Sequence, residues 1–273
     1  MESYKNQFML SGKVAVVTGG AGFLGQRFCC GLAEFGARVA VIDIDGKAAE
    51  AFAETLRSNY STQAIGVACD VADSDSVGRM VSTVVDTLGS IDVLHNNAAT
   101  KSRDLNAFFA PYEDYSYATW REVMAVNIDG VFLVSQAVGR QMLRQNRGGS
   151  IIQTSSIYGI LGPDKRIYEG SQYLGREINT PAVYSVSKAA VLGLTRHLAT
   201  TWAEHGIRVN SVTLGGVESG QNDTFRKRYA DRVPLRRMGH ADEMVSAVVF
   251  LASDASSYVT GQNLVIDGGL SAW

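Results

Sequence analysis

Short apolar runs alternate along the chain with longer segments of helical periodicity. The runs are apolar on both faces, which predicts buried strands of a parallel sheet with helices covering both sides. About seven runs have this character: residues 14–17, 38–42, 64–68, 91–94, 150–153, 207–212 and 264–266. With right-handed crossovers between them, they predict a doubly wound α/β fold.

Signals for helix ends agree with this alternation. The helix after the third strand is expected to begin at Asp73 or the next residue and to end before Gly89, a residue type that suits a helix C-terminus. A later helix is expected to have Thr180 as its N-cap, Pro181 as its first residue, and its end before Gly206.

Charge and composition narrow the class of protein. The chain carries 25 Lys and Arg against 27 Asp and Glu, a formal net charge of −2, which excludes the broad basic surface of a nucleic-acid-binding protein. It has no linker, repeat or low-complexity tract, so residues 1–273 are predicted to form a single domain. No uninterrupted apolar run approaches the roughly 18 residues of a membrane span, and Met1–Gly12 lacks the apolar core of a signal peptide. We therefore expect a cytoplasmic protein without a membrane partner.

The three cysteines give no indication of a catalytic or metal-binding site. Cys29, Cys30 and Cys69 lie among apolar residues and are expected to be small core side chains in a reducing compartment. No Cys or His pair has the spacing of metal ligands, so no metal site is expected.

A glycine-rich segment, Thr18–Gly25, directly follows the first strand and opens a helix. Glycines such as Gly19, Gly22 and Gly25 let the backbone approach a pyrophosphate, while the helix N-terminus offers N–H groups and a positive dipole end. The pattern alone also fits a simple tight turn. Its place after the first strand, followed by an acid at the end of the next strand, favours dinucleotide binding.

That acid is Asp43. A carboxylate at this position accepts hydrogen bonds from the ribose hydroxyls and repels a 2′-phosphate. No Arg or Lys stands in the glycine loop or immediately after Asp43 to receive such a phosphate, so NAD is preferred to NADP. The alternative role for Asp43 is a capping acid, although Asp45 is better placed to cap the following helix.

Tyr184 and Lys188 are one turn apart on the same face of a predicted helix. A phenol titrates near pH 10, and a nearby cation favours its phenolate, so the pair is a candidate general acid/base. A Tyr and a Lys at this spacing also occur on ordinary helix surfaces. The pair therefore gains weight only in combination with other motifs.

Further motifs accompany this pair along most of the chain. They are Asn96-Asn97-Ala98, Val126–Gly130, Ser155–Gly159, Ile207–Asn210, Phe250–Asp254, Val259–Gln262 and Asp267–Gly269. On these motifs, the sequence from about Leu10 to Gly269 resembles the short-chain dehydrogenase/reductase family, in its single-domain branch. The resemblance implies a Rossmann fold, a nicotinamide cofactor and hydride transfer at an alcohol carbon.

The resemblance also implies a catalytic set. Tyr184 exchanges a proton with the substrate oxygen, and Lys188 lowers the pKa of Tyr184 and holds the nicotinamide ribose. Ser156 hydrogen-bonds the substrate oxygen, with Ser155 as the alternative. Asn127 anchors a water relay to Lys188, unless it is a core Asn paired with backbone. The implied cofactor-binding residues are Gly19, Gly22, Phe23, Leu24, Gly25, Asp43, Asp70, Val71, Asn97, Ala98, Tyr184, Lys188, Gly215, Val217 and Ser219.

Three departures from the family pattern stand out. The glycine spacing resembles that of longer members that modify sugar nucleotides, and Ala99 replaces the usual glycine after Asn-Asn-Ala. Leu214-Gly215 replaces the usual Pro-Gly, which is expected to leave the following loop less rigid.

These features predict an NAD-dependent oxidoreductase that interconverts a secondary alcohol and a ketone. Two alternatives stay open: a redox-neutral nucleotide-sugar epimerase or dehydratase, suggested by the glycine spacing, and a non-catalytic NAD sensor. The complete set of Asn127, Ser156, Tyr184 and Lys188 argues against the sensor, which has no need of an acid/base pair.

The segment from Ser156 to Tyr184 is longer than in most relatives, and the excess, about Pro163–Asn179, is expected to form an inserted loop beside the substrate. Its side chains offer hydrogen bonds and charge rather than an apolar slot: Asp164, Lys165, Arg166, Tyr168, Glu169, Gln172, Tyr173, Arg176 and Glu177. With the basic run Arg226–Arg228, this predicts a polar, small-molecule substrate such as a sugar or sugar acid. The stretch Ile167-Tyr168-Glu169-Gly170 also resembles members linked to surface-glycan sugar synthesis.

The terminal segment, Val259–Trp273, contains an apolar strand that ends the predicted sheet. An uncovered edge strand invites pairing. Since the resemblance implies a homo-oligomer, a tetramer or a dimer, this segment is expected to lie against another subunit.

Overall fold

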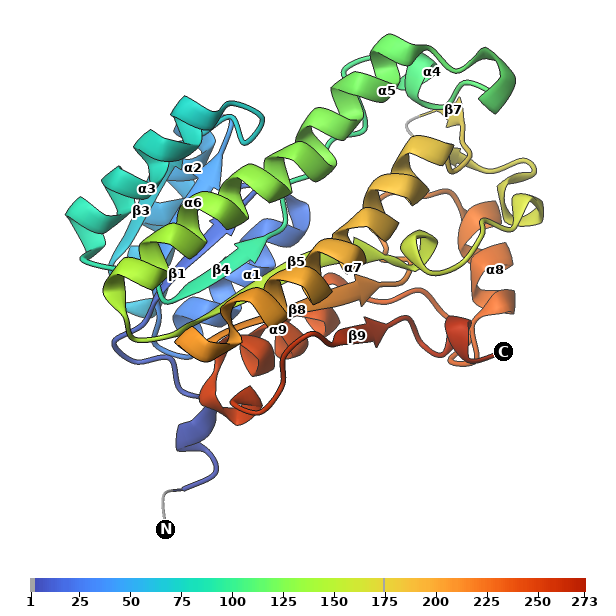
Figure 1. Ribbon diagram of the computed structural model, residues 1–273. Coiled ribbons are helices and arrows are strands. Elements are labelled where there is room, and N and C mark those ends of the chain that lie inside the picture. The colour runs from blue at the N-terminus through green and yellow to red at the C-terminus, as the bar shows by residue number, and fades with distance from the viewer. Residues whose placement is uncertain (1–2, 174) are drawn as a thin grey trace.

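A computed structural model describes residues 3–173 and 175–273. Within these residues, seven parallel strands form one sheet in the order β3-β2-β1-β4-β5-β8-β9. The strands are β1 Val14–Thr18, β2 Arg38–Asp43, β3 Ala64–Ala68, β4 Val93–Asn96, β5 Gly149–Ser156, β8 Ile207–Leu214 and β9 Asn263–Ile266. The predicted doubly wound α/β fold and its single domain are therefore confirmed, and the chain order reverses between β1 and β4 (Figure 1).

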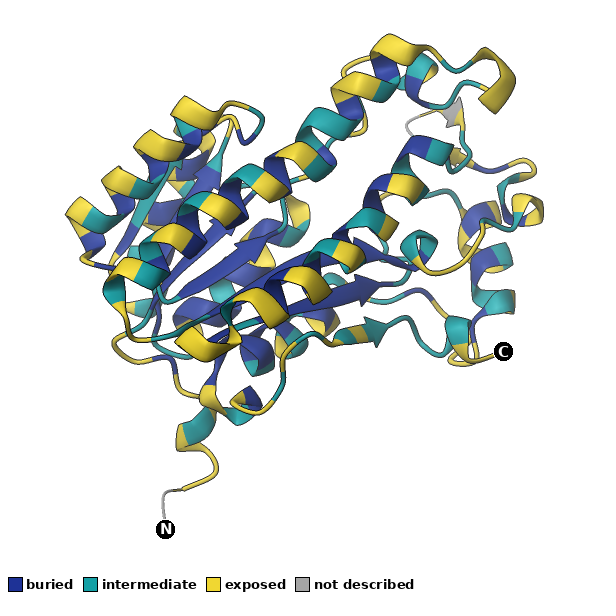
Figure 2. Ribbon diagram, in the orientation of Figure 1, coloured by how far each residue is buried: buried dark blue, intermediate teal, exposed yellow. Residues whose placement is uncertain are grey.

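Helices cover both faces of the sheet. The longer ones are α1 Phe23–Glu34, α2 Gly46–Tyr60, α3 Ser74–Leu88, α6 Gly130–Gln145, α7 Ala182–Trp202 and α9 Val245–Ala252. Residues of α1, α2 and α9 form one core cluster, and residues of α3, α6 and α7 form the other. Strand β1 serves both, because Ala15 and Val17 face the first cluster while Val14 and Val16 face the second. Figure 2 shows the result, with buried strands between helices that are exposed on their outer faces.

The two edges of the sheet differ. Along β3, the N–H of Gly66 donates to Glu50 Oε2 at 2.8 Å and the carbonyl of Ala64 accepts from Arg57 Nη1 at 2.6 Å. A Cβ on Gly66 would lie 2.2 Å from the Glu50 nitrogen, so only glycine lets α2 approach this closely. At the opposite edge no comparable cover lies over β9 in the described part of the chain, and Leu264 is 38% exposed.

Several strands extend further at their carboxyl ends than their apolar runs predict. Strand β4 includes His95 and Asn96, β5 runs to Ser156, and β8 runs to Leu214. Most of the added residues are polar and buried, with hydrogen-bond partners; His95 Nε2, for example, lies 2.8 Å from Thr154 Oγ1, although its Nδ1 has no partner among the described residues. Polar residues thus continue the strands into the edge where ligands bind in such sheets.

The predicted start of α7 is wrong. Its N-cap is Pro181 and the helix begins at Ala182, one position later than expected. The hydroxyl of Thr180 does not cap the helix, because it lies 2.5 Å from the Tyr168 hydroxyl. The predicted ends of α3 are confirmed: the Asp73 carboxylate caps its N-terminus.

One continuous helical run, Tyr117–Gln145, is long and apolar enough to span a membrane, with a mean hydropathy of 1.2 over its most apolar window. It comprises α5 (Tyr117–Met124), a π-helical turn and α6. In this protein its apolar face packs on the sheet, with Val134 and Val138 fully buried, so it is a core helix of the domain.

Candidate active site

The glycine-rich loop between β1 and α1 forms a closely packed turn. Gly19 has φ +62°, in the left-handed region, and a Cβ on Gly25 would lie 1.9 Å from the Gly19 oxygen. Helix α1 begins at Phe23, after Gly22, and no side chain caps it. Its first N–H groups therefore face the adjoining cleft with the positive end of the helix dipole, as an anionic diphosphate requires.

The carboxylate of Asp43 lies at the end of β2 next to this loop. Its two oxygens accept from the N–H groups of Ala21 and Asp45, each at 3.2 Å. Asp45, not Asp43, caps α2 by accepting from Lys47 and Ala48. Asp43 is therefore held at the cleft without serving as the helix cap.

The end of β4 is fastened to the same loop. The N–H groups of Asn97 and Ala98 both donate to Thr18 Oγ1, at 3.0 and 3.1 Å. The amide of Asn97 also donates to the carbonyls of Thr18 and Gly19. These bonds bring the ends of β1 and β4 together at the point where the strand order reverses.

A cleft of about 1,240 Å³ runs along this edge of the sheet. Most of the predicted cofactor residues line it: Gly19, Gly22, Phe23, Leu24, Gly25, Asp43, Asp70, Val71, Asn97, Ala98 and Ser219. Tyr184 and Gly215 instead line an adjoining cavity, and Val217, bridged to Gly239, lines neither. The tight glycine turn, uncapped helix and carboxylate at the end of β2 together fit a dinucleotide.

Ser156 and Tyr184 meet at the adjoining cavity. Ser156, at the end of β5, hydrogen-bonds Tyr184 and accepts from the N–H of Tyr158 at 3.3 Å. Ser155 points the other way and donates to the carbonyl of Lys188 at 2.7 Å. A Cβ on Gly159 would lie 2.7 Å from that carbonyl, so the turn after β5 packs directly on α7.

Lys188 lies beneath this cavity and is only 4% exposed. Its ammonium donates to the carbonyl of Thr154 at 3.0 Å, and burial lowers the pKa of Lys188 to about 8. Burial raises the pKa of Tyr184, and the hydrogen bond from Ser156 opposes this shift. Lys188 was expected to lower the pKa of Tyr184; in the structure burial is the largest cause acting on that pKa, and the ammonium of Lys188 donates to Thr154.

Asn127 is fully buried in the π-helical turn Ala125–Asp129. Its side chain accepts from the N–H of Thr100 at 2.8 Å and donates to the Thr100 carbonyl at 3.3 Å. It thus pairs with the loop after β4, as the core alternative predicts. A π turn widens the helix and recurs at functional sites.

The loop after β8 is fastened at several points. Gly215 donates to Ile266 at 2.9 Å, Gly239 donates to Gly216 at 2.9 Å, and Ser219 donates to Gln221 Oε1 at 2.8 Å. Replacing the family's proline by Leu214 was expected to loosen this loop; in the structure Leu214 pairs with Ile266 of β9.

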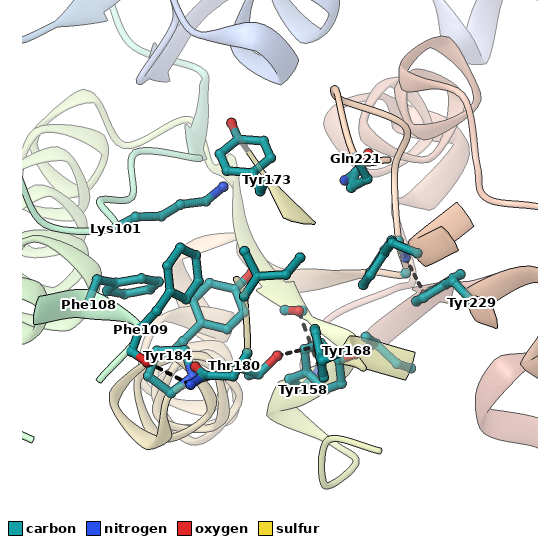
Figure 3. A pocket seen from close by; sticks show the side chains of 18 of the residues that line it. Lys101, Phe108, Phe109, Tyr158, Tyr168, Tyr173, Thr180, Tyr184, Gln221 and Tyr229 are labelled. Atoms are coloured by element: carbon teal, nitrogen blue, oxygen red, sulfur yellow. Dashed lines mark hydrogen bonds between the residues drawn. The ribbon is translucent and has the colours of Figure 1, made fainter. Parts of the chain in front are cut away.

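The cavity at Tyr184 has a volume of about 210 Å³ and aromatic walls. Its aromatic lining residues are Phe108, Phe109, Tyr158, Tyr168, Tyr173, Phe225 and Tyr229. Figure 3 shows those that it labels, all but Phe225, around the pocket. The Tyr168 hydroxyl donates to the Tyr158 hydroxyl at 2.7 Å. The volume of the cavity is below the roughly 300–1,000 Å³ of pockets for drug-sized ligands, which suits a small molecule.

The inserted loop stands beside the cavity, as predicted, but its charges do not line it. Asp164 pairs with Arg166 and with Arg232 of α8 (Asp223–Arg232), while Glu169 pairs with Arg228. The side chain of Arg176 lies outside the described part of the structure. The described residues that the loop gives to the cavity are Tyr168, Tyr173, Ile178 and Asn179. The prediction of a charged wall is therefore wrong for the described side chains: none of the loop's charges lines the cavity, and Asp164 and Glu169 pair with helix α8 instead.

Lys101 was not predicted as a site residue. It follows β4 and the Asn-Asn-Ala-Ala stretch, and it lines both the cleft and the cavity. Its amine lies 4.3 Å from the centre of the Tyr173 ring. Lys101 and Arg103 both follow β4, and a cation just beyond the carboxyl end of a central strand was the available signal.

Comparisons with known proteins agree with this geometry. Residues 22–271 match a family profile described as "Enoyl-(Acyl carrier protein) reductase". A D-threitol dehydrogenase of Mycolicibacterium smegmatis is 35% identical, over 96% of this chain and 94% of that protein.

Two solved structures are similar over nearly the whole chain. A gluconate 5-dehydrogenase from Burkholderia cenocepacia, in complex with NADP and tartrate, has a TM-score of 0.86 and 32% identity, with 98% of each chain covered. An NAD⁺-bound xylitol dehydrogenase has a TM-score of 0.81 and 32% identity, covering 95% of this chain and 99% of that one. The sheet, the glycine turn, the Tyr184 cavity and these matches together show that the chain belongs to the short-chain dehydrogenase/reductase family.

Proposed function

We propose that the protein is an NAD-dependent dehydrogenase that interconverts a secondary alcohol and a ketone on a small, sugar-like molecule. The observation that carries the proposal is the meeting of Ser156 and Tyr184 at a small cavity beside the dinucleotide cleft. Relatives named for threitol, gluconate and xylitol support a hydroxylated substrate. Because these relatives are dehydrogenases, neither a redox-neutral epimerase nor a non-catalytic sensor is proposed.

In the proposed mechanism, Ser156 donates a hydrogen bond to the reacting oxygen and positions it against Tyr184. Tyr184 accepts the hydroxyl proton during oxidation and returns it during reduction. The nicotinamide supplies the hydride acceptor or donor when it is bound. Lys188 places a positive charge on the same helix face one turn away, and Asn127 fastens the loop after β4 beside it.

The preference for NAD rests on Asp43. Its carboxylate stands at the cleft at the end of β2 and would repel a 2′-phosphate. The relatives do not agree on the cofactor, since one named structure holds NADP and another NAD⁺. Binding constants for both cofactors therefore belong to the test of this proposal.

The test is an assay of the purified protein with threitol, gluconate and xylitol, each with NAD⁺ and with NADP⁺. We expect reduced nicotinamide to form, more efficiently with NAD⁺. Tyr184→Phe should lower turnover by roughly 10²–10⁴, the usual contribution of a positioned acid/base, with cofactor affinity retained. Turnover by Tyr184→Phe equal to that of the unmodified protein would remove Tyr184 from the mechanism.

A further inference from the structure

Lys101 has a position that the proposed mechanism does not use. It lines the cavity at Tyr184 and the cofactor cleft, so it stands where the two meet. Figure 3 shows its side chain extended toward the ring of Tyr173, at one end of the cavity, while Tyr184 and Thr180 lie at the other. The amine of Lys101 lies 4.3 Å from the centre of that ring.

Three cations near the cavity are already paired, and Arg103 lines the cofactor cleft but not the cavity. Arg228 pairs with Glu169, Arg232 pairs with Asp164, and Lys188 donates to a backbone carbonyl. Lys101 forms no ion pair with another residue of the described chain. Among the described residues that line the cavity, it is the single cation, and none of them is acidic.

An amine in this setting favours an anionic partner. The surrounding protein lowers the pKa of Lys101, because it removes part of the water that stabilises the charge. The face of Tyr173 returns some of that stabilisation through its quadrupole. The Lys101 side chain is exposed, so a carboxylate can reach it and would return more of that stabilisation through a charge-assisted hydrogen bond.

We infer that Lys101 binds the carboxylate of a hydroxylated acid whose reacting hydroxyl lies at Ser156 and Tyr184. This inference rests on the proposed function and narrows it from sugar-like molecules to sugar acids. It assigns specificity to a residue after β4, because Asp164 and Glu169 of the inserted loop pair with α8 and no described charge of that loop lines the cavity. The diphosphate of the cofactor is a second anion that Lys101 could bind. The experiment distinguishes it from the substrate carboxylate.

The experiment compares gluconate with the neutral polyols threitol and xylitol, using Lys101→Met, which removes the charge, and Lys101→Arg, which keeps it. We expect the unmodified enzyme to have its highest kcat/KM with gluconate. Lys101→Met should raise the KM for gluconate about 10–100-fold, the usual effect of losing a charged hydrogen bond, and change the polyols less than about threefold. Lys101→Arg should keep most of the gluconate activity. Lys165→Met is the matched control, because this exposed lysine lies outside the cavity.

Three outcomes would overturn the inference. The first is a preference of the unmodified enzyme for neutral polyols. The second is an equal loss with all three substrates in Lys101→Met. The third is a loss of NAD affinity in that variant, which would assign Lys101 to the cofactor. If no substrate turns over, the proposed function fails separately. In that case, calorimetric titration of gluconate into the protein saturated with NADH tests the anion site directly. The inference requires that gluconate binds to the unmodified protein and that Lys101→Met abolishes this binding.

Discussion

Two influences act in opposite directions on the phenol of Tyr184. Burial raises its pKa and the hydrogen bond with Ser156 lowers it, with burial the larger effect. Oxidation needs the phenolate, which forms as pH rises toward a raised pKa, whereas reduction needs the neutral phenol, which is present below it. We therefore expect kcat/KM for oxidation to climb from neutral into alkaline pH, while kcat/KM for reduction stays level and falls only at high pH. Ser156→Ala should move the inflection higher; an oxidation profile that is flat above pH 7 would contradict this.

Asp43 and Asp45 form a matched pair of acids at the end of β2. Asp43→Ala should weaken NAD binding about 10–100-fold, because the charged acceptor for the ribose hydroxyls is lost. It should also reduce the difference in affinity between NAD and NADP, because the same carboxylate no longer repels the 2′-phosphate. Asp45→Ala should leave both binding constants unchanged and cost about 1 kcal/mol of stability, since this side chain caps α2. The binding constants of both cofactors check this; an unmodified protein that already prefers NADP would refute the role of Asp43.

His95 makes the stability of the fold sensitive to acid. Burial, reinforced by the charge of Lys188, lowers the pKa of this imidazole from about 6.5 to about 3. Between these values the unfolded chain binds a proton that the folded chain does not, so the free energy of unfolding falls with falling pH, by up to about 1.4 kcal/mol per pH unit. Urea unfolding between pH 7 and 5 measures the slope. His95→Gln should flatten it, and exposed His197→Gln should not; equal slopes in all three proteins would rule out His95 as the cause.

At the scale of elements, the inserted loop joins the cavity to α8. Ile167 and Tyr168 pack with Phe225 and Tyr229 of that helix. Replacing Pro163–Asn179 with a tight turn removes part of the cavity wall. It should therefore raise the KM for the polar substrate at least about tenfold and leave NAD affinity unchanged.

The control for this deletion is Arg166→Ala, which alters an exposed charge of the same loop without touching the cavity. It should leave the KM unchanged. An unchanged KM in the shortened protein would show that the loop takes no part in substrate binding.

Most of the elements follow from the sequence, and the exceptions share a physical cause. Apolar runs place the strands, but they stop short where His95, Asn96 and Thr154 carry strands onward as buried polar residues with partners. Those partners come from distant parts of the chain, so a local pattern does not contain them. Thr180 shows the same limitation at a helix start, because its hydroxyl hydrogen-bonds Tyr168 instead of capping the helix that the local pattern predicts.

The candidate site divides in the same way. Family motifs lead to the glycine turn, Asp43, Ser156 and Tyr184, whose positions depend on the shared sheet. The aromatic wall and the role inferred for Lys101 depend on how the inserted loop folds against α8. Its charges look available to substrate in the sequence, and only their pairing with Arg228 and Arg232 shows that they are not.

At the scale of the whole molecule, the uncovered β9 edge predicts self-association. We expect sedimentation at micromolar concentration to give a dimer or tetramer, with residues 259–273 at the contact. Leu264→Lys should shift the distribution toward smaller species, because it places a charge on the open edge. Tyr4→Lys, at an exposed site near the N-terminus, should not. A monomeric unmodified protein would contradict the expectation.

The covered β3 edge determines what such an association could become. A chain with two open edges can add copies at both ends and grow into a filament without limit. Here Glu50 and Arg57 of α2 bind one outward N–H and one outward carbonyl of β3, those of Gly66 and Ala64, so a copy joined through β9 presents a partly covered edge on its far side. We therefore expect growth through the sheet to favour a pair joined at β9 over an open filament, because α2 competes for the backbone groups of β3.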